Sequence, residues 1–170
     1  MEGDKLESEL KSVITDANVL IDYLAADRKI LKLIAGIFNE VYIPFDILKE
    51  VKQLTEKQAT SYGFIVYYPE ADTYFKSANT SNGLSFEDNI CIIDSKKNGW
   101  GIVTNDSKMR KKCEDEGVEI FWGMQLMILL IRKGSLSKKD AIRTAEKMKL
   151  SNTRITEKNL KDFILKINQI

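Results

Sequence analysis

The sequence contains no histidine and only two cysteines and two prolines. Without histidine, a Ser-His-Asp triad, a histidine general base and the common histidine-containing zinc sites are excluded. Cys91 and Cys113 show no metal-ligand spacing, and so few cysteines fit a reducing compartment. Any catalysis must therefore depend on carboxylates, hydroxyls, amines or a bound metal ion.

Long apolar segments and a surplus of charge are also missing. The most apolar run, Met124–Ile131, contains Gln125 and is too short to cross a bilayer. The polar start, Met1–Lys11, lacks the apolar core of a secretory signal. These features predict a cytoplasmic protein with no membrane partner. Because 26 basic residues nearly balance 25 acidic ones, a nucleic acid would have to bind a local patch.

Short apolar segments of strand type alternate with segments of helical periodicity. The predicted strands are Ser12–Thr15, Val41–Ile43, Phe64–Tyr68, Gly101–Thr104 and Val118–Phe121. Between them, helices are predicted over Val19–Ala26, Arg28–Asn39, Phe45–Thr55, Glu70–Ala78, Ser85–Lys97 and Ser107–Glu116. Three more follow, over Met124–Lys133, Ser137–Met148 and Glu157–Ile167. The pattern predicts a three-layer α/β/α domain with five parallel strands over residues 1–132, and a helical C-terminal extension over 133–170 packed on it.

Acidic residues stand where a parallel sheet places its ligand sites, at the carboxyl ends of strands. Asp16 directly follows the first predicted strand, and Asp106 follows the fourth after one intervening residue. Asp88 lies in the first turn of the helix that leads to the fourth strand, and Glu50 lies on the helix after the second strand. Each acid also has a structural explanation, as a helix cap or, for Glu50, as a solvated helix residue.

One metal site explains the joint placement better than four independent structural roles. Hydrolytic chemistry without histidine needs another way to activate water and to compensate the negative charge that develops in the reaction. Hard divalent cations supply both and prefer carboxylate ligands. Because the chain has no histidine, Mg²⁺ or Mn²⁺ is expected rather than zinc.

Four segments, in this order along the chain, resemble the motifs of PIN-domain nucleases. They are Thr15–Ile21, Pro44–Leu54 around Glu50, Leu84–Asn89 and Val103–Asp106, and the resemblance spans residues 12–132. In the tail, Gly134–Ser137 and Arg154–Thr156 resemble the helical extension of a PIN subgroup of predicted nucleic-acid-binding proteins.

The resemblance implies a metal-dependent endoribonuclease that hydrolyses RNA, and a toxin of a toxin–antitoxin pair is one candidate role. It implies catalytic Asp16, Glu50, Asp88 and Asp106, with Asp16, Asp88 and Asp106 as metal ligands and Asn18 and Thr104 in support. Expected partners are RNA, an antitoxin protein and a second copy of the chain. The alternative is a non-catalytic nucleic-acid-binding or regulatory PIN-like module, although a degenerate site usually loses an acid.

Other α/β functions fit less well. A receiver-like phosphoacceptor needs an acidic neighbour beside Asp16 and a lysine after the last strand, and neither is present. Dinucleotide binding needs a glycine-rich turn after the first strand, which is also missing.

Three further features leave alternatives open. Lys108, Arg110 and Lys111 could bind an RNA backbone or form a solvated face. Asp94 stands where the family usually has a small apolar residue, so it is either an outward-facing acid or an additional group behind the site. Trp122 is expected in the core rather than as a stacking platform for a base.

Overall fold

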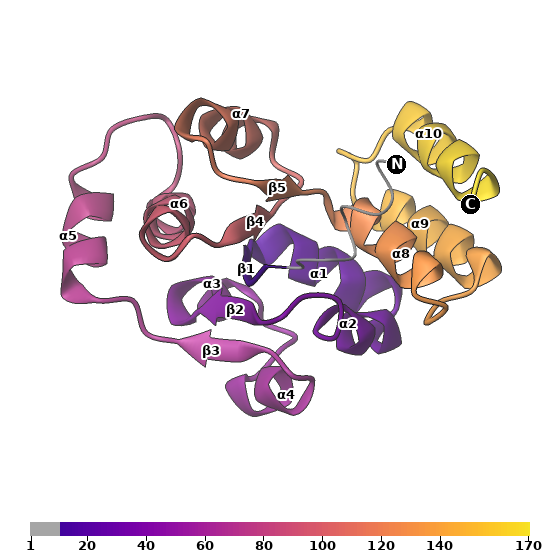
Figure 1. Cartoon of the computed structure of the whole chain (residues 1–170), viewed down its shortest axis with the longest axis horizontal. Coiled ribbons are helices and arrows are strands. Elements are labelled where there is room, and N and C mark those ends of the chain that lie inside the picture. The colour runs from indigo at the N-terminus through magenta and orange to yellow at the C-terminus, as the bar shows by residue number, and fades with distance from the viewer. Residues whose placement is uncertain (1–10) are drawn as a thin grey trace.

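The computed structural model describes residues 11–170, which contain a five-stranded, all-parallel sheet (Figure 1). The expectation for residues 1–10 of the polar start lies outside the described residues. The strands are β1 (Val13–Thr15), β2 (Val41–Pro44), β3 (Ile65–Tyr67), β4 (Gly101–Val103) and β5 (Ile120–Phe121). Their order is β3-β2-β1-β4-β5, and every neighbouring pair is parallel. The predicted sheet is confirmed.

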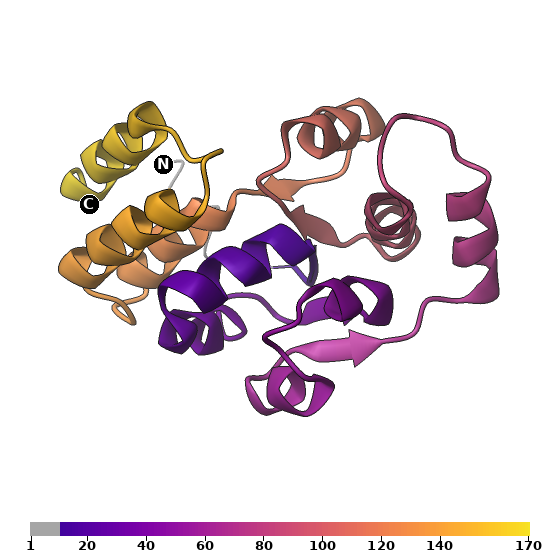
Figure 2. The same cartoon turned by 180° about the vertical axis from the view of Figure 1, so that it is seen from behind.

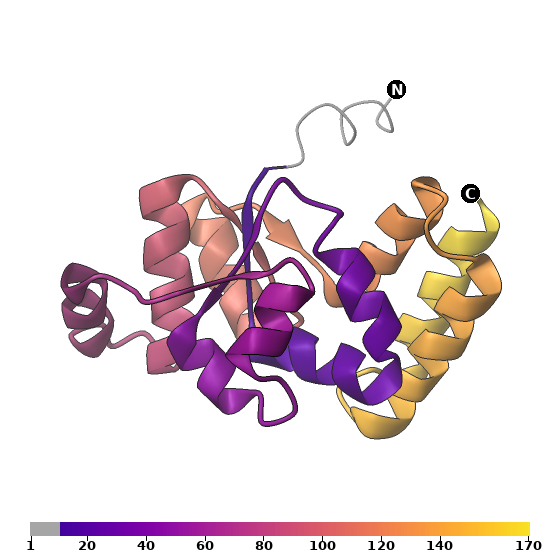
Figure 3. The same cartoon turned by 90° about the horizontal axis from the view of Figure 1, so that it is seen from below.

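Helices cover both faces of the sheet. In chain order they are α1 (Ala17–Ala26), α2 (Arg28–Ile34), α3 (Phe45–Glu50), α4 (Glu56–Ser61), α5 (Ala71–Ala78), α6 (Phe86–Asn98) and α7 (Ser107–Glu116). Figure 3 shows α6 and α7 on one side of the strands and α1 and α2 on the other. Strand order reverses at β1, and right-handed crossovers then place the later helices on the opposite face. The three-layer α/β/α class is therefore confirmed.

The single helix predicted over Phe45–Thr55 is wrong. Helix α3 ends at Glu50, and a separate helix, α4, begins at Glu56. Thr55 caps α4, because its hydroxyl accepts a hydrogen bond from Gln58 N at 3.2 Å and the Gln58 side chain accepts one from Thr55 N at 3.0 Å. This capping box was present in the sequence as Thr-x-x-Gln but was overlooked.

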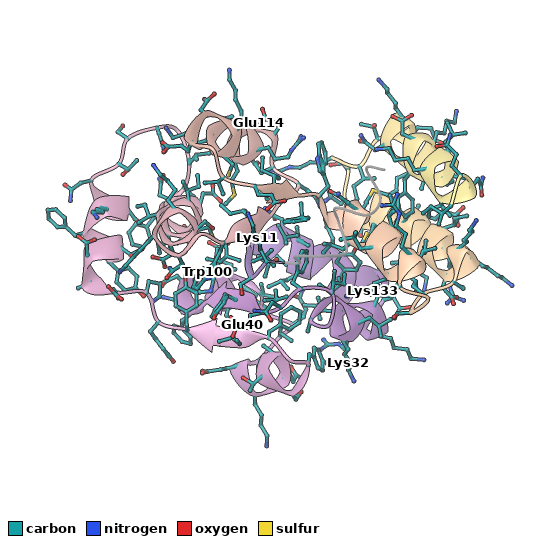
Figure 4. The ribbon with its side chains drawn as sticks, in the orientation of Figure 1. Lys11, Lys32, Glu40, Trp100, Glu114 and Lys133 are labelled. Atoms are coloured by element: carbon teal, nitrogen blue, oxygen red, sulfur yellow. The ribbon has the colours of Figure 1, made fainter. Side chains whose placement is uncertain are left out.

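The C-terminal residues form helices α8 (Gly123–Arg132), α9 (Lys138–Ser151) and α10 (Glu157–Asn168). Figure 2 shows α9 lying beside α1, and the two helices are in contact. Figure 4 shows Lys133 between α2 and α8, where its Nζ donates a hydrogen bond to the carbonyl of Ile37 at 3.0 Å. None of the helices in residues 11–170 is long and apolar enough to span a membrane.

Candidate active site

The two central strands, β1 and β4, bring Asp16 and Asp106 together through Thr104. Asp16 N donates to the carbonyl of Val103 at 3.0 Å, which fixes the end of β1 against the end of β4. The Asp16 side chain is only 4% exposed. Thr104 Oγ1 donates to Asp16 Oδ2 at 2.9 Å and accepts a hydrogen bond from Asp106 N at 3.1 Å. The order of the strands reverses here, which is where open α/β sheets place their ligand sites.

Asp16, Asp88 and Asp106 each cap a helix, but the capping hydrogen bond uses only one carboxylate oxygen of each. Asp16 Oδ1 accepts from Asn18 N at 2.9 Å, and Asp106 Oδ1 accepts from Met109 N at 2.9 Å. Asp88 Oδ2 accepts from Ser85 N at 3.1 Å and closes the predicted capping box of α6. Capping therefore does not exclude a second role, because each carboxylate has two oxygens.

The charges of the acids influence one another. The pKa of Asp16 is raised, chiefly by burial and further by the negative charges of Asp88 and Asp106, although hydrogen bonds to its neighbours oppose the shift. Burial raises the pKa of Asp88, and Asp106 and Glu87 add to the effect. Glu50 is more exposed than Asp16 and Asp88. Its pKa is nevertheless raised, first by partial burial and then by the charges of Glu87, Asp16 and Asp88. We call these five residues, Asp16, Glu50, Glu87, Asp88 and Asp106, the acidic cluster.

Glu87 is the member of the acidic cluster that sequence reasoning missed. It lies next to Asp88 in the first turn of α6. Acids in that position are ordinarily explained by the helix dipole, which favours negative charge at a helix start. Only the fold shows that this turn lies close enough to Glu50 for the charges of Glu87 and Asp88 to raise the pKa of the Glu50 carboxyl.

Little positive charge compensates the acidic cluster. Among the ion pairs formed within residues 11–170, one involves a cluster acid, namely Arg154 Nη1 to Asp106 Oδ2 at 3.7 Å. Gathering carboxylates without cations raises the free energy of the folded state, and a divalent cation would lower it. The chemistry of this donor set therefore suits Mg²⁺ or Mn²⁺.

The carboxylates do not surround a single point. In the part of the chain that the structure describes, no three acidic side chains lie close enough to hold one ion directly. Mg²⁺ commonly binds only one or two protein carboxylates and keeps several waters. The residues present fit an ion held in that manner rather than one enclosed by protein ligands.

The basic residues of α7 differ in what they contact. Lys108 and Lys111 are exposed to solvent. The guanidinium of Arg110 instead lies over the ring of Trp122, 3.3 Å from its centroid, and burial lowers the Arg110 pKa. Trp122 is 44% exposed, so the expectation of a core residue is wrong. The reason is that β5 is a two-residue edge strand, and Trp122 follows it as the N-cap of α8.

Asp94 does not face outward. Its side chain is 4% exposed and accepts hydrogen bonds from Tyr67 Oη and Thr73 Oγ1, both at 2.6 Å. These contacts join α6 to β3 and α5. The buried Asp94 carboxylate therefore has a hydrogen-bond donor for each of its oxygens, which explains why an acid is tolerated at this position.

A cavity of about 850 Å³ adjoins the acidic cluster, because its lining includes Asp106 of the cluster and Asn18, whose backbone N donates to Asp16. The other walls include Trp122 and parts of α8, the loop between α9 and α10, and α10. The acidic cluster is thus open toward a space formed jointly by the sheet edge and the C-terminal helices.

A parallel α/β/α fold with acids at the ends of neighbouring strands agrees with a nuclease-like fold. Comparison with family models supports this fold, because a model described as a PIN domain matches residues 12–169. The protein therefore belongs to the PIN-domain family. The match continues through α9 and α10, beyond the residues 12–132 that carry the sequence motifs. None of the curated proteins compared with the chain matches it.

Thr104→Val is expected to impair the acidic cluster without disturbing the sheet. The substitution removes the hydroxyl that links Asp16 to Asp106 but keeps the shape of a fully buried side chain. Losing a buried hydrogen-bond partner of a carboxylate costs about 1–3 kcal/mol of stability. Loss of a group that orients a metal ligand lowers activity by about 10–100-fold. Urea unfolding measures the change in stability, and an assay of RNA cleavage, the activity that the sequence resemblance implies, measures the change in activity.

Thr144→Val is the matched control. Thr144 is also buried, but its hydroxyl has no hydrogen-bond partner within residues 11–170. Its replacement should leave RNA cleavage unchanged and the protein at least as stable. Equal effects of the two substitutions on cleavage would mean that Thr104 has no special connection to the acidic cluster.

The metal-free protein should lose stability relative to Asp16→Asn as the pH rises. Because the Asp16 pKa is raised above its ordinary value of 3.8, the folded chain binds this proton more tightly than the unfolded chain does. The favourable contribution of protonated Asp16 to the free energy of unfolding is complete below about pH 3.8, and it is lost as the pH rises through the raised pKa of the folded protein. Denaturant unfolding of both proteins in chelator, from about pH 4 to about pH 8, measures the difference. A difference that stays constant over this range would contradict the burial of an ionising Asp16.

Proposed function

We propose that this protein is a metal-dependent endoribonuclease that hydrolyses the phosphodiester bonds of RNA at the acidic cluster. The observation that carries the proposal is the gathering of Asp16, Glu50 and Asp88 with little compensating positive charge. The pKa of each carboxyl is raised, first by burial and then by the charges of neighbouring acids. Such an arrangement is unfavourable unless a cation binds there. Membership of the PIN-domain family supports the nuclease class.

Separate roles follow for the acids. One or two of Asp16, Asp88 and Asp106 would bind Mg²⁺ or Mn²⁺ directly, and the rest would act through bound waters. When bound, the ion supplies positive charge against the phosphate oxygens and helps activate water. Glu50 is more exposed than the other three, and its raised pKa suits a group that accepts the proton of the attacking water. The water oxygen forms a bond to phosphorus, and the bond to the departing ribose oxygen breaks.

Other residues support this chemistry. Thr104 positions the Asp16 carboxylate by its hydrogen bond, and the backbone of Asn18 donates to the other Asp16 oxygen. The exposed Lys108 and Lys111 are proposed to contact the phosphate backbone of RNA, because they follow Asp106 on the first turns of α7.

A non-catalytic nucleic-acid-binding module is the second candidate. Two observations favour it. Asp106 is paired with Arg154, and within residues 11–170 no three carboxylates lie close enough to hold one ion directly. In that case the domain would bind RNA without cutting it.

Incubation of the purified protein with an end-labelled single-stranded RNA in Mg²⁺ or Mn²⁺ decides between the two candidates. Internal cleavage that requires the metal supports the endoribonuclease. If the protein binds the RNA but cleaves it under none of these conditions, the endoribonuclease is overturned in favour of the non-catalytic module.

The biological setting is part of the proposal. A toxin of a toxin–antitoxin pair would have an antitoxin as protein partner and could act as a homodimer. A short neighbouring reading frame that encodes a DNA-binding head and an acidic tail would support the toxin role. A genomic neighbourhood without such a frame would count against it.

A further inference from the structure

The cavity beside the acidic cluster has the size and position of a substrate subsite. Its volume is about 850 Å³. Pockets of about 300–1,000 Å³ hold small organic ligands, so a nucleotide unit has room here. Because Asp106 and Asn18 are among the lining residues, the cavity adjoins the acidic cluster.

Two side chains of this cavity have the chemistry that contacts nucleic acid. Trp122 is 44% exposed and carries the Arg110 guanidinium over its ring. Exposed aromatic rings of this kind stack on unpaired bases, and arginine adds to the stacking. Arg154 is 73% exposed at its side chain and lies 3.7 Å from Asp106. A guanidinium can bind phosphate through two parallel hydrogen bonds.

A buried acid on α1 holds the loop that carries Arg154. Asp22 is 6% exposed, and both of its carboxylate oxygens accept hydrogen bonds from Asn152 Nδ2 at 3.0 Å. Asn152 Oδ1 in turn accepts from the backbone N of Arg154 at 2.9 Å. The backbone of this exposed arginine is therefore fixed relative to the domain core.

The same acid is linked to the backbone beside Trp122. Asn105 Nδ2 donates to Asp22 Oδ2 at 3.4 Å, and Asn105 Oδ1 accepts from Gly123 N at 2.9 Å. The approach is so close that a Cβ at Gly123 would lie 2.7 Å from Asn105 Nδ2. One buried carboxylate thus positions both walls of the cavity that carry the tryptophan and the arginine.

We propose that this cavity binds the nucleotide next to the scissile phosphate of a single-stranded RNA, with its base stacked on Trp122 and its phosphate paired with Arg154. The inference rests on the proposed nuclease function of the acidic cluster. A single strand is the occupant because its bases are free to stack on a side chain, whereas those of a duplex are already paired and stacked. Asp22, which also lines the cavity, positions these two walls through Asn152 and Asn105.

Binding measurements on an uncleaved complex test the subsite. The Asp16→Asn protein is used as the non-cleaving background, and fluorescence anisotropy follows a short labelled single-stranded RNA. Adding Trp122→Ala should raise Kd by about 5–150-fold, since stacking on one base contributes about 1–3 kcal/mol. Adding Arg154→Ala should reduce the slope of log affinity against log salt by about 0.7, the change expected for one phosphate contact with a single strand.

Matched controls distinguish the subsite from general effects of lost aromatic or charged residues. Phe75 on α5 is 69% exposed, and Arg143 on α9 pairs with Asp140 at 2.8 Å, and neither lines the cavity. Phe75→Ala and Arg143→Ala should leave both Kd and the salt slope unchanged.

The outcomes separate this proposal from the proposed function. The subsite is overturned if Trp122→Ala and Arg154→Ala bind RNA as the controls do. It is also overturned if duplex RNA competes as well as a single strand. Both conclusions hold even if the parent protein cleaves RNA. If both substitutions weaken binding as expected but the parent never cleaves RNA, the subsite stands and the nuclease function falls. Absence of any RNA binding to the background protein overturns the subsite as well.

Discussion

We expect Asp16→Asn to lower the rate of RNA cleavage by about 1,000-fold or more, equivalent to about 4 kcal/mol of transition-state stabilisation. Asp16 is the most buried acid of the acidic cluster and is bound to Thr104 at the point where β1 and β4 end. An amide in its place cannot supply a negative charge to a cation. The interactions that a metal ion makes with the phosphate would therefore be lost with it.

The same substitution should leave the metal-free protein as stable as the parent or more stable. Asparagine keeps an oxygen that accepts the hydrogen bond from Asn18 N, and it is as good an N-cap as aspartate. It also removes a buried charge whose pKa is raised by burial and by neighbouring acids. Thermal melting in chelator measures this effect, and adding Mg²⁺ should raise the melting temperature of the parent alone.

Asp27→Asn is the matched control for capping. Asp27 caps α2 and accepts from Lys29 N at 2.9 Å, the same arrangement as Asp16 has with Asn18. It does not belong to the acidic cluster. The control should cleave RNA and respond to Mg²⁺ as the parent does. Normal cleavage by Asp16→Asn, with a normal Mg²⁺ response, would reduce Asp16 to a helix cap.

Removal of the metal should have an effect of similar size. In excess EDTA we expect cleavage to fall to background, because the acidic cluster then lacks the charge that stabilises the phosphate oxygens. Mg²⁺ or Mn²⁺ should restore it. At about 100 times Kd, the bound ion should also stabilise the folded protein by about 2.7 kcal/mol. Asp16→Asn purified in parallel controls for contaminating ribonucleases, and full activity of the parent in EDTA would exclude a metal-dependent mechanism.

The centre of the sheet could be predicted from sequence because β1, β2 and β4 are almost entirely buried and are short, continuous apolar segments. Ile14, Ile43 and Ile102 at the centres of β1, β2 and β4 are completely buried. The break between α3 and α4 could not be found by periodicity alone. Apolar residues continue at helical spacing through Val51 and Leu54, both buried, although the chain leaves the helix after Glu50.

The acids at the strand ends could also be proposed from sequence, because their position depends only on local order along the chain. Glu87, Asp22 and Trp122 depend instead on contacts between distant elements. Asp22 reaches Asn152 across 130 positions of the sequence, and no local pattern indicates such a pair. The cavity between the sheet and the C-terminal helices was missed for the same reason.

The most direct test of the metal site is the anomalous scattering of Mn²⁺ in crystals of the parent protein grown or soaked with MnCl₂. We predict an anomalous peak at the acidic cluster, with carboxylate oxygens of one or two of Asp16, Asp88 and Asp106 as ligands and waters completing the coordination. The same experiment with Asp16→Asn should lose or weaken the peak. A parent crystal saturated with Mn²⁺ that shows no peak at these residues would contradict the central claim that the acidic cluster is a metal-dependent catalytic site.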